Sequence, residues 1–166
     1  MKKLIIIAAV GRNNELGYNK DLIWKFKEDM KFFKNTTINH TVVMGDNTYF
    51  SLPSLLEKRK HIVLSFNRSD FPDDVIVLRS IDEFFDLTKT IDDDIYVIGG
   101  ASIYKAFINY VDEIILTEIN SSALADVFFP EFNKDNYDIK ILGENIENDI
   151  YFKHVLYKKR NKKWKR

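Results

Sequence analysis

Short, uninterrupted runs of apolar and often β-branched residues recur along the first three quarters of the chain. Runs of this kind, without polar alternation, are typical of strands buried on both faces, as in a parallel sheet covered by helices. They predict strands at Leu4 to Val10, Thr41 to Met44, His61 to Ser65, Val75 to Leu78, Ile95 to Ile98 and Glu113 to Ile119.

Helical patterns lie between several of these runs. Phe26, Met30 and Phe33 recur at i, i+4 and i+7 and predict one apolar helix face. Residues 81 to 87 begin with acidic side chains in their first turn, and residues 102 to 110 follow a Gly-Gly turn. The chain therefore alternates strands and helices.

The last quarter has a different pattern. Tyr137 to Leu142 and Ile150 to Tyr157 alternate apolar and polar residues, and Gly143 to Asp149 forms a polar connection between them. This predicts an antiparallel strand pair at the sheet edge. The expected fold class is α/β: a single mixed, mostly parallel twisted sheet with helices on both faces and a C-terminal antiparallel pair. Residues 1–157 are expected to form the domain, and residues 158–166 a basic tail.

Composition excludes several classes of protein. The 166 residues include no cysteine, so disulfides, cysteine-based zinc sites and thiol catalysis are excluded. The three histidines, His40, His61 and His154, lack the spacing of a metal site, and no metal is predicted. Apolar residues make up 45% of the chain, which is typical of a packed domain.

The formal net charge of zero is a sum over unlike parts. The last nine residues carry seven basic and no acidic side chains, which leaves 18 basic against 25 acidic residues, a charge of −7, in residues 1–157. An acidic body argues against nucleic-acid binding, and the tail is expected to be a solvated terminus, with contact to polyanions as the alternative. The longest early apolar run, Leu4 to Val10, has seven residues, too few to span a bilayer, and no signal-peptide cleavage site follows it. A cytoplasmic protein is expected.

Ligands of such sheets bind at the carboxyl ends of strands, so the residues after each run are candidates for chemistry. Gly11 to Ile23 forms a long loop before Trp24 and is either a functional lid or a surface connection. Gly99 and Gly100, and similarly Gly45, stand where a strand passes into a helix. Glycines there permit close approach of a phosphate, but a purely connecting turn is an equally good interpretation.

Asp29 is the anomalous charge of the first predicted helix. It lies four residues before Phe33, beside the apolar stripe and close to Trp24. Desolvation there would raise the carboxyl pKa, as in a proton donor or a cation-binding acid. The alternative is an acid that only complements the helix dipole.

Taken together, the order and spacing of these residues resemble bacterial dihydrofolate reductases from Leu4 to about Tyr157. The matching landmarks are Ile7-Ala8-Ala9, Leu16-Gly17, Trp24, Asp29, Phe32-Phe33-Lys34, Thr41 to Gly45, Thr48, Ser51, Arg59, Ile62 to Ser65, Ile98 to Gly100, Tyr104, Leu116-Thr117 and Phe129-Pro130. The resemblance implies a monomeric oxidoreductase of one-carbon metabolism, an antifolate target, that reduces 7,8-dihydrofolate to tetrahydrofolate by hydride transfer from NADPH.

The resemblance also implies roles for individual residues. Asp29 would promote protonation of the pterin at N5, Thr117 would orient its carboxylate, and Trp24 would hold an ordered water, with Leu22 nearby in the lid. Arg59 would clamp the glutamate α-carboxylate of the substrate. The substrate walls would be formed by Ile7, Met30, Phe33, Leu52, Leu56, Ile98 and Tyr104.

For the cofactor, the resemblance implies a mobile lid over the nicotinamide and a cis peptide between Gly99 and Gly100. The cofactor-binding residues would be Ala9, Leu16, Gly17, Leu22, Gly45, Asp46, Asn47, Thr48, Leu64, Ser65, Arg79, Gly99, Gly100, Ala101, Ser102, Ile103 and Tyr104.

Asp46 is the sharpest departure from the family pattern, which usually has an arginine there that contacts the 2′-phosphate of NADPH. An acid repels that phosphate but can hydrogen-bond the free 2′-hydroxyl of NADH. Arg68 and Arg79 are the residues that can still supply positive charge. We expect NADPH as cofactor with a weakened preference over NADH. The alternatives are a pterin or flavin-precursor reductase of related fold and a non-catalytic nucleotide-binding module.

Overall fold

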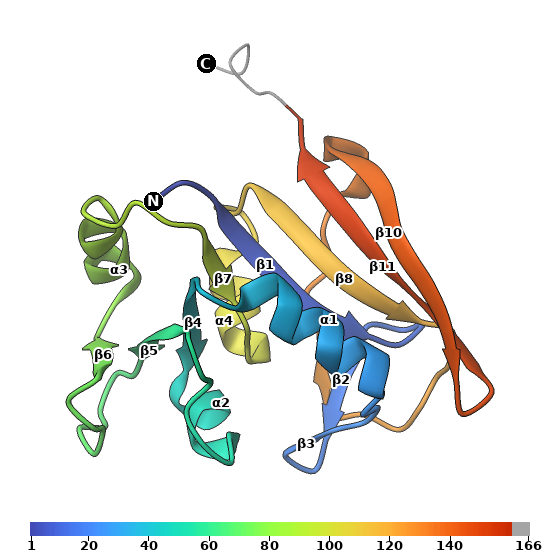
Figure 1. Cartoon of the computed structure of the whole chain (residues 1–166), viewed down its shortest axis with the longest axis horizontal. Coiled ribbons are helices and arrows are strands. Elements are labelled where there is room, and N and C mark those ends of the chain that lie inside the picture. The colour runs from blue at the N-terminus through green and yellow to red at the C-terminus, as the bar shows by residue number, and fades with distance from the viewer. Residues whose placement is uncertain (161–166) are drawn as a thin grey trace.

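Eight strands form one sheet in the order β10-β11-β8-β1-β7-β4-β5-β6 (Figure 1). The structure, a computed structural model, describes residues 1–160. The strands are β1 (Leu4–Val10), β4 (Thr41–Gly45), β5 (Lys60–Leu64), β6 (Val75–Leu78), β7 (Ile95–Val97), β8 (Glu113–Ile119), β10 (Tyr137–Glu147) and β11 (Ile150–Lys159). β11 runs antiparallel to both of its neighbours, and the other pairings in this sheet are parallel. The predicted fold class is confirmed.

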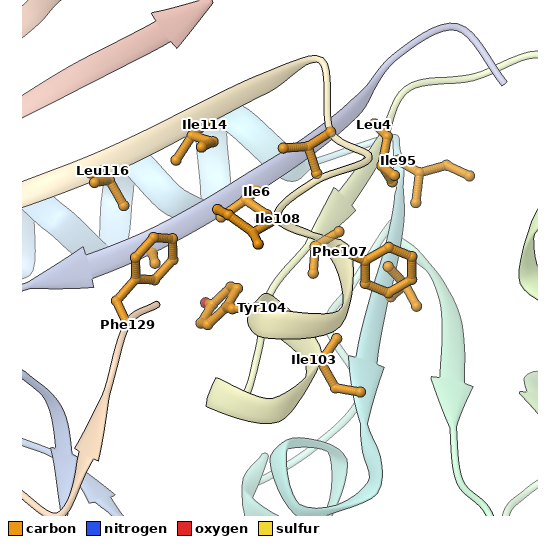
Figure 2. Close-up of a cluster of buried hydrophobic side chains, with 14 of the residues drawn as sticks. Leu4, Ile6, Ile95, Ile103, Tyr104, Phe107, Ile108, Ile114, Leu116 and Phe129 are labelled. Carbon is orange, nitrogen blue, oxygen red and sulfur yellow. The ribbon is translucent and has the colours of Figure 1, made fainter. Parts of the chain in front are cut away.

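Helices cover both faces of the sheet, as the sequence predicts. They are α1 (Lys27–Thr37), α2 (Asp46–Ser51), α3 (Ile81–Thr88) and α4 (Ala101–Phe107). Leu4 and Ile6 of β1 pack in one cluster with Phe107 of α4 (Figure 2), and Ile5 and Ile7 pack on the other face with residues of α1 and α2. Because successive strand residues face opposite ways, an uninterrupted apolar β1 supplies both cores.

The prediction of a long loop from Gly11 to Ile23 is wrong in part. The segment contains β2 (Glu15–Tyr18) and β3 (Asp21–Leu22), which form a second, three-stranded sheet with β9 (Val127–Phe128). Glu15 is only 2% exposed, and its carboxylate accepts hydrogen bonds from the backbone N–H groups of Asn13 and Ala123. Glu15 is buried because it accepts hydrogen bonds from backbone groups, one of them on the remote Ala123. Contacts of this kind leave no hydrophobic periodicity in the sequence.

The C-terminal pair is longer than predicted. β10 continues through Gly143 to Glu147, so the predicted polar connection is reduced to a turn at Asn148 and Asp149, both with positive φ. A bulge between Ile141 and Gly143 shifts the register of β10 against β11. β10 is an edge strand, where polar side chains are tolerated, so polarity was a poor guide to its end.

The predicted apolar stripe of the first helix also needs correction. Phe26 precedes α1 and is buried, and Phe33 packs against the sheet, but Met30 is 63% exposed. Phe32 instead faces inward, where its ring stacks on the imidazole of His154 with 3.8 Å between ring centroids. The stripe is therefore rotated by part of a turn from the predicted one.

The body extends beyond the expected domain end at Tyr157. β11 reaches Lys159, and Arg160 donates from Nε to Asp138 of β10 at 3.0 Å. The remaining residues of the predicted tail, 161–166, lie outside the described residues. Within residues 1–160 no helix is long and apolar enough to cross a membrane.

Candidate functional site

Three polar side chains from three elements meet near the C-terminal strand pair. Thr117 of β8 donates its hydroxyl to Oδ1 of Asp29, on the first turn of α1, at 2.5 Å. His154 of β11 lies with Nδ1 at 2.9 Å from the same hydroxyl oxygen and 3.7 Å from Oδ1 of Asp29. The resemblance implies the pairing of Asp29 with Thr117, and the structure adds His154.

Burial dominates the electrostatics of Asp29. The side chain is 20% exposed, and desolvation raises the pKa of its carboxyl group above the usual range. The hydrogen bond from Thr117 and the proximity of His154 partly oppose that rise, whereas the charge of Glu147 adds to it. A carboxyl group of raised pKa is suited to delivering or sharing a proton. The desolvation expected from the sequence is therefore present.

The first turn of α1 is held by a residue far away in sequence. Phe26 at the N-cap offers no side-chain acceptor. The carboxylate of Glu147, at the end of β10, accepts instead from the backbone N–H groups of Lys27 at 2.8 Å and Glu28 at 3.2 Å. This contact compensates the exposed N–H groups of the helix and fixes the turn that carries Asp29.

Most apolar side chains predicted to line a substrate site lie on one face of the sheet, but Tyr104 packs in the core cluster on the opposite face. Ile7 of β1 packs in one cluster with Phe33 of α1. Met30 and Leu22 are 63% and 64% exposed. Trp24 packs with Phe26 in a smaller cluster at the start of α1. The other predicted wall residues in the cluster of Ile7 are Leu52, Leu56 and Ile98.

Arg59 is held in place by α1. Its Nη1 donates to Oγ1 of Thr37 in the last turn of the helix at 3.1 Å, and its Nε donates to the carbonyl of Glu57 at 3.0 Å. Within residues 1–160 Arg59 forms no ion pair with a carboxylate. Its positive charge is therefore oriented but not neutralised, as a carboxylate-binding residue requires.

The carboxyl ends of β4 and β7 meet in a glycine-rich edge. The peptide bond between Gly99 and Gly100 is cis, as the resemblance implies, and the N–H of Gly45 donates to the carbonyl of Gly99 at 2.9 Å. A Cβ at Gly45 would lie 2.9 Å from Cγ1 of Ile103, and Gly99 has φ +121°. Glycines thus stand at the N-termini of α2 and α4, where no side chain blocks the backbone. Such an edge fits the pyrophosphate of a dinucleotide.

Tyr104 of α4 lies under this edge. Its ring is 5% exposed, and its hydroxyl donates to the carbonyl of Ile7 at 2.8 Å. Burial raises the pKa of this phenol above its usual value, so it stays protonated as a donor. Tyr104 thus supports Ile7 and Gly99 from behind. The predicted cofactor residues around it are the half-buried Ala101, the exposed Ser102 and the buried Ile103.

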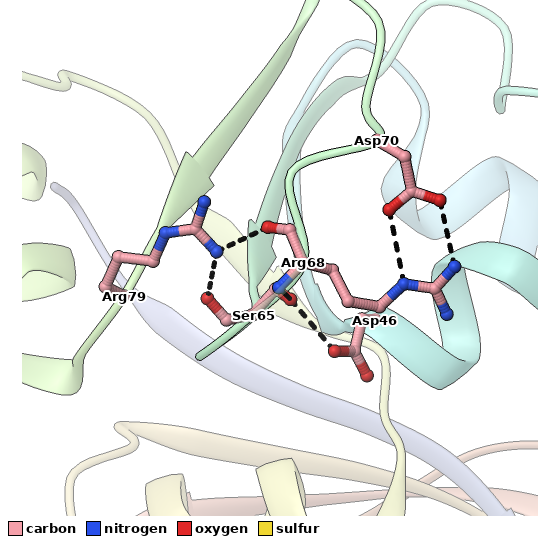
Figure 3. A network of polar contacts seen from close by, with 5 residues as sticks. All are labelled: Asp46, Ser65, Arg68, Asp70 and Arg79. Carbon is pink, nitrogen blue, oxygen red and sulfur yellow. Dashed lines mark hydrogen bonds and ion pairs between the residues drawn. The ribbon is translucent and has the colours of Figure 1, made fainter.

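Asp46, at the start of α2, is engaged in a network with Ser65 (Figure 3). Ser65 donates its hydroxyl to Oδ2 of Asp46 at 2.9 Å. Arg68 forms a two-point ion pair with Asp70, at 3.2 and 2.9 Å, and its guanidinium lies 3.9 Å from the ring centre of Phe50. Arg79 donates from Nη1 to the carbonyls of Ser65 and Arg68. The cations of this network are thus already committed to partners on the protein.

Other predicted cofactor residues lie on the neighbouring edges of the sheets. Gly17 accepts from the N–H of Asp126 at 3.0 Å, and Asn19 donates its N–H to the carboxylate of the same residue at 3.0 Å. The segment expected to act as a lid is therefore hydrogen-bonded to Asp126, the residue that precedes β9. The remaining residues are Ala9 and Leu16, which pack against the core, the half-buried Thr48, the exposed Asn47 and the buried Leu64.

Sequence reasoning missed two residues of this site, Glu147 and His154. Glu147 lay in the segment predicted as a connection. The spacing of His154 from the other histidines excludes a metal site and predicts no other role for it. The alternation of β11, which places Phe152, His154 and Leu156 on one face, is the signal that could have located His154.

A separate pocket of about 400 Å³ lies at the ends of β1, β8 and β11. It is lined by charges of both signs, among them Arg12, Glu118, Glu131, Lys134 and Lys153. Neither Asp29 nor Arg59 lines it, so the chemistry described above lies elsewhere.

Comparison with known proteins gives consistent matches. Residues 3–159 match the family model described as dihydrofolate reductase. A dihydrofolate reductase of Buchnera aphidicola subsp. Schizaphis graminum is 36% identical over 131 residues, 78% of this chain and 80% of the relative. That of Bacillus subtilis is 29% identical over 158 residues, covering 93% and 94%. In fold, the chain is similar to a dihydrofolate reductase from Enterococcus faecalis solved with NADP(H), with a TM-score of 0.87 at 24% identity and 96% and 97% coverage.

Proposed function

Because this chain belongs to the dihydrofolate reductase family, we propose that it reduces 7,8-dihydrofolate to tetrahydrofolate with NADPH as the reductant. It is an oxidoreductase, and we expect it to act as a monomer in the cytoplasm. The observation that carries the assignment of roles is the carboxyl group of Asp29, desolvated beside the sheet and held by the hydroxyl of Thr117.

Asp29 would bind the pterin ring through its carboxylate, which can accept hydrogen bonds from the amino and amide nitrogens of the ring. Its raised pKa favours sharing a proton with the bound pterin, and protonation at N5 makes the neighbouring C6 a better hydride acceptor. Thr117 keeps the carboxylate in one orientation. When bound, the dihydronicotinamide supplies the hydride.

Arg59 would bind the α-carboxylate of the glutamate at the other end of the substrate. The guanidinium is held through Nη1 by Thr37 and through Nε by the carbonyl of Glu57. Among the described residues, Nη2 has no such partner and can bind the substrate carboxylate. Ile7 and Phe33, with their neighbours in the same apolar cluster, would contact the rings between the two charged ends. The distance between the carboxylate that binds the pterin and the guanidinium that binds the glutamate would then select a folate.

The finer cofactor proposal is a weakened preference for NADPH over NADH. Asp46 and Ser65 occupy the edge where the resemblance implies contacts to the adenosine ribose. A carboxylate there disfavours a 2′-phosphate by repulsion, and Arg68 is paired with Asp70. The glycine edge at Gly45 and Gly99 fits either cofactor, because the pyrophosphate is common to both.

Steady-state kinetics on the purified chain test both proposals. Turnover of dihydrofolate with NADPH supports the assigned reaction, and its absence contradicts it. The ratio of kcat/KM for NADPH to that for NADH tests the finer proposal. A ratio of several hundred or more would show that the charge of Asp46 does not relax the preference.

A further inference from the structure

The contact between His154 and Thr117 has no role in the reaction proposed above. Nδ1 of His154 lies 2.9 Å from Oγ1 of Thr117, which in turn lies 2.5 Å from Oδ1 of Asp29. All three side chains are buried or mostly buried, and they come from β11, β8 and α1. The strand register places His154 directly opposite Thr117 in the β8–β11 pair, so the pairing of the two strands itself brings the two side chains together.

The direction of each hydrogen bond follows from counting protons. Ionised Asp29 can only accept, so the single hydroxyl proton of Thr117 must point to it. The oxygen of Thr117 is then left with lone pairs facing His154, and Nδ1 must carry a proton and donate it. Ionised Asp29 therefore requires the Nδ1–H form of the imidazole.

The surroundings favour a neutral imidazole in a fixed orientation. Its ring stacks on Phe32 and meets Phe152 edge to face, with 5.9 Å between ring centroids in the second contact. Burial lowers the pKa of His154, and the nearby charge of Asp29 opposes that shift only in part. A neutral ring has one N–H, so its donation to Thr117 depends on which nitrogen carries the proton.

Few other charges face this group of three side chains in the described structure. Glu147, from β10, acts on Asp29 and raises its pKa. On α1, the side chains of Glu28 and Lys31 form an exposed ion pair with each other. On β8, Glu118 accepts from the hydroxyl of Tyr157, and β1 contains no charged residue.

From this geometry we infer that His154 is a positioning residue for the reduction. By donating from Nδ1 to Thr117, it orients the threonine hydroxyl toward Asp29 and stabilises the ionised carboxylate through that hydroxyl. The inference rests on the function proposed above. His154 makes its hydrogen bond to Thr117 and not to Asp29, so its main effect on the reaction passes through Thr117.

Two variants at this position separate donation from packing. His154→Phe keeps a ring to stack on Phe32 but removes the donor. His154→Asn removes the ring but keeps an amide N–H near the position of Nδ1. With His154→Phe we expect the single-turnover hydride-transfer rate at its low-pH plateau to fall about 3- to 10-fold, the effect of losing one hydrogen bond. We expect His154→Asn to stay close to the wild type.

The pH dependence adds a readout that packing alone would not move. Since a hydrogen bond to the charged form lowers a carboxyl pKa, its loss in His154→Phe should raise the pKa of Asp29 further. The decline of the rate should then move to higher pH. The Asp29 carboxyl carbon, followed by NMR in the protein without ligands, should titrate at higher pH in this variant and nearly unchanged in His154→Asn.

Thr117→Val tests whether His154 acts on Asp29 through the hydroxyl of Thr117. In that background, the effect of His154→Phe on the rate and on the titration of Asp29 should be much smaller, because the hydroxyl that transmits it is absent and only the direct 3.7 Å approach of His154 to Asp29 remains. Tyr157→Phe is the matched control. It removes a hydrogen bond between the same two strands, to Glu118 on the opposite face, and should retain the wild-type profile.

Either of two results overturns the inference: an unchanged Asp29 titration in His154→Phe, or an undiminished effect of that change in Thr117→Val. The NMR titration needs no turnover. A wild-type chain inactive on dihydrofolate would therefore contradict the proposed function, whereas the titration would still decide whether His154 acts on Asp29.

Discussion

At the scale of single residues, two aspartates at the carboxyl edge of one sheet are given different tasks by their surroundings. Asp29 is desolvated, and its raised pKa makes it fit to share a proton with a bound pterin. Asp46 lies half-buried at the edge, accepts from Ser65, and faces the region expected to bind the ribose. The first residue is essential to the proposed chemistry, and the second affects only which cofactor is preferred.

Replacing Asp46 tests this division of tasks. Asp46→Asn removes the negative charge but keeps an oxygen to accept from Ser65. We expect kcat/KM for NADPH to rise on the order of tenfold, since two charges near a protein surface interact with a few kcal/mol at contact distance and less when further apart. The value for NADH should change little. Equal changes with the two cofactors would show that Asp46 does not face the 2′ position.

Asp70→Asn is a complementary variant. It releases Arg68 from its two-point ion pair and should also favour NADPH, without altering the charge at position 46. A preference that responds to Asp46 but not to Asp70 would assign the effect to repulsion alone.

At the scale of elements, the catalytic helix depends on the C-terminal strand pair. Glu147 ends β10 and accepts from the first N–H groups of α1, 120 residues earlier in the chain. His154 of β11 approaches the same helix through Phe32 and Thr117. Two side chains of the strand pair therefore shift the pKa of Asp29 in opposite senses: Glu147 raises it, and His154 opposes that rise.

Glu147→Ala should lower the stability of the fold and change the pH profile. Loss of an N-terminal cap costs about 1 kcal/mol, which corresponds to a fall in Tm of about 2–4 °C for a chain of this size. Removing the negative charge should also lower the pKa of Asp29, so the decline of the hydride-transfer rate should move to lower pH. Calorimetry and single-turnover kinetics measure the two effects.

The matched variant Glu147→Gln keeps acceptor oxygen but no charge. It should recover part of the lost stability while showing the same shift of the profile. A profile that moved to higher pH in either variant would contradict the electrostatic role assigned to Glu147.

The strands were easier to predict from the sequence than the contacts between distant segments. Val75–Leu78 and Glu113–Ile119 have the predicted bounds, because a strand buried on both faces is apolar throughout. Asp29 could be singled out because a charge beside an apolar stripe is unusual. Glu147 and Glu15 could not, because each satisfies backbone groups of a remote segment, and no local pattern encodes the partner.

At the scale of the whole molecule, the zero net charge is a cancellation. Residues 1–157 carry −7, and both proposed ligands are anions, so their charges must be met locally by groups such as Arg59. The compensating basic residues are concentrated at the C-terminus, where Lys158 and Lys159 belong to β11. A net negative body slows the approach of anions at low ionic strength.

Truncation after Arg160 tests the contribution of the terminal charges. It removes four basic residues and changes the formal net charge from zero to −4. We expect association of NADPH, followed by stopped-flow fluorescence, to slow about 2- to 5-fold at low salt and to match the full chain at high salt, where charges are screened. The kcat should stay the same.

A full-length chain with glutamine at positions 162, 163, 165 and 166 controls for the change in length and should behave as the truncated one. Identical association rates for all three chains at every salt concentration would show that the terminal charges do not steer the cofactor.

The same carboxyl group that serves the reaction should cost stability. The pKa of Asp29 is raised in the folded state above the unfolded value of 3.8, so its ionisation disfavours folding at pH above the folded-state pKa. That cost disappears as the pH falls below 3.8. Asp29→Asn should therefore be at least as stable as the wild type at pH 7, and a Tm no lower than that of the wild type would show that a loss of activity in it does not come from unfolding.

The pH dependence of single-turnover hydride transfer in wild type and Asp29→Asn tests the central claim most directly. In wild type we expect a plateau at low pH and a decline above the raised pKa of Asp29. In Asp29→Asn we expect a rate at least about 100-fold lower at pH 7, rising steadily with acidity because the proton must come from solution. A variant with the wild-type rate and the wild-type profile would contradict the assignment of Asp29 as the group that promotes protonation.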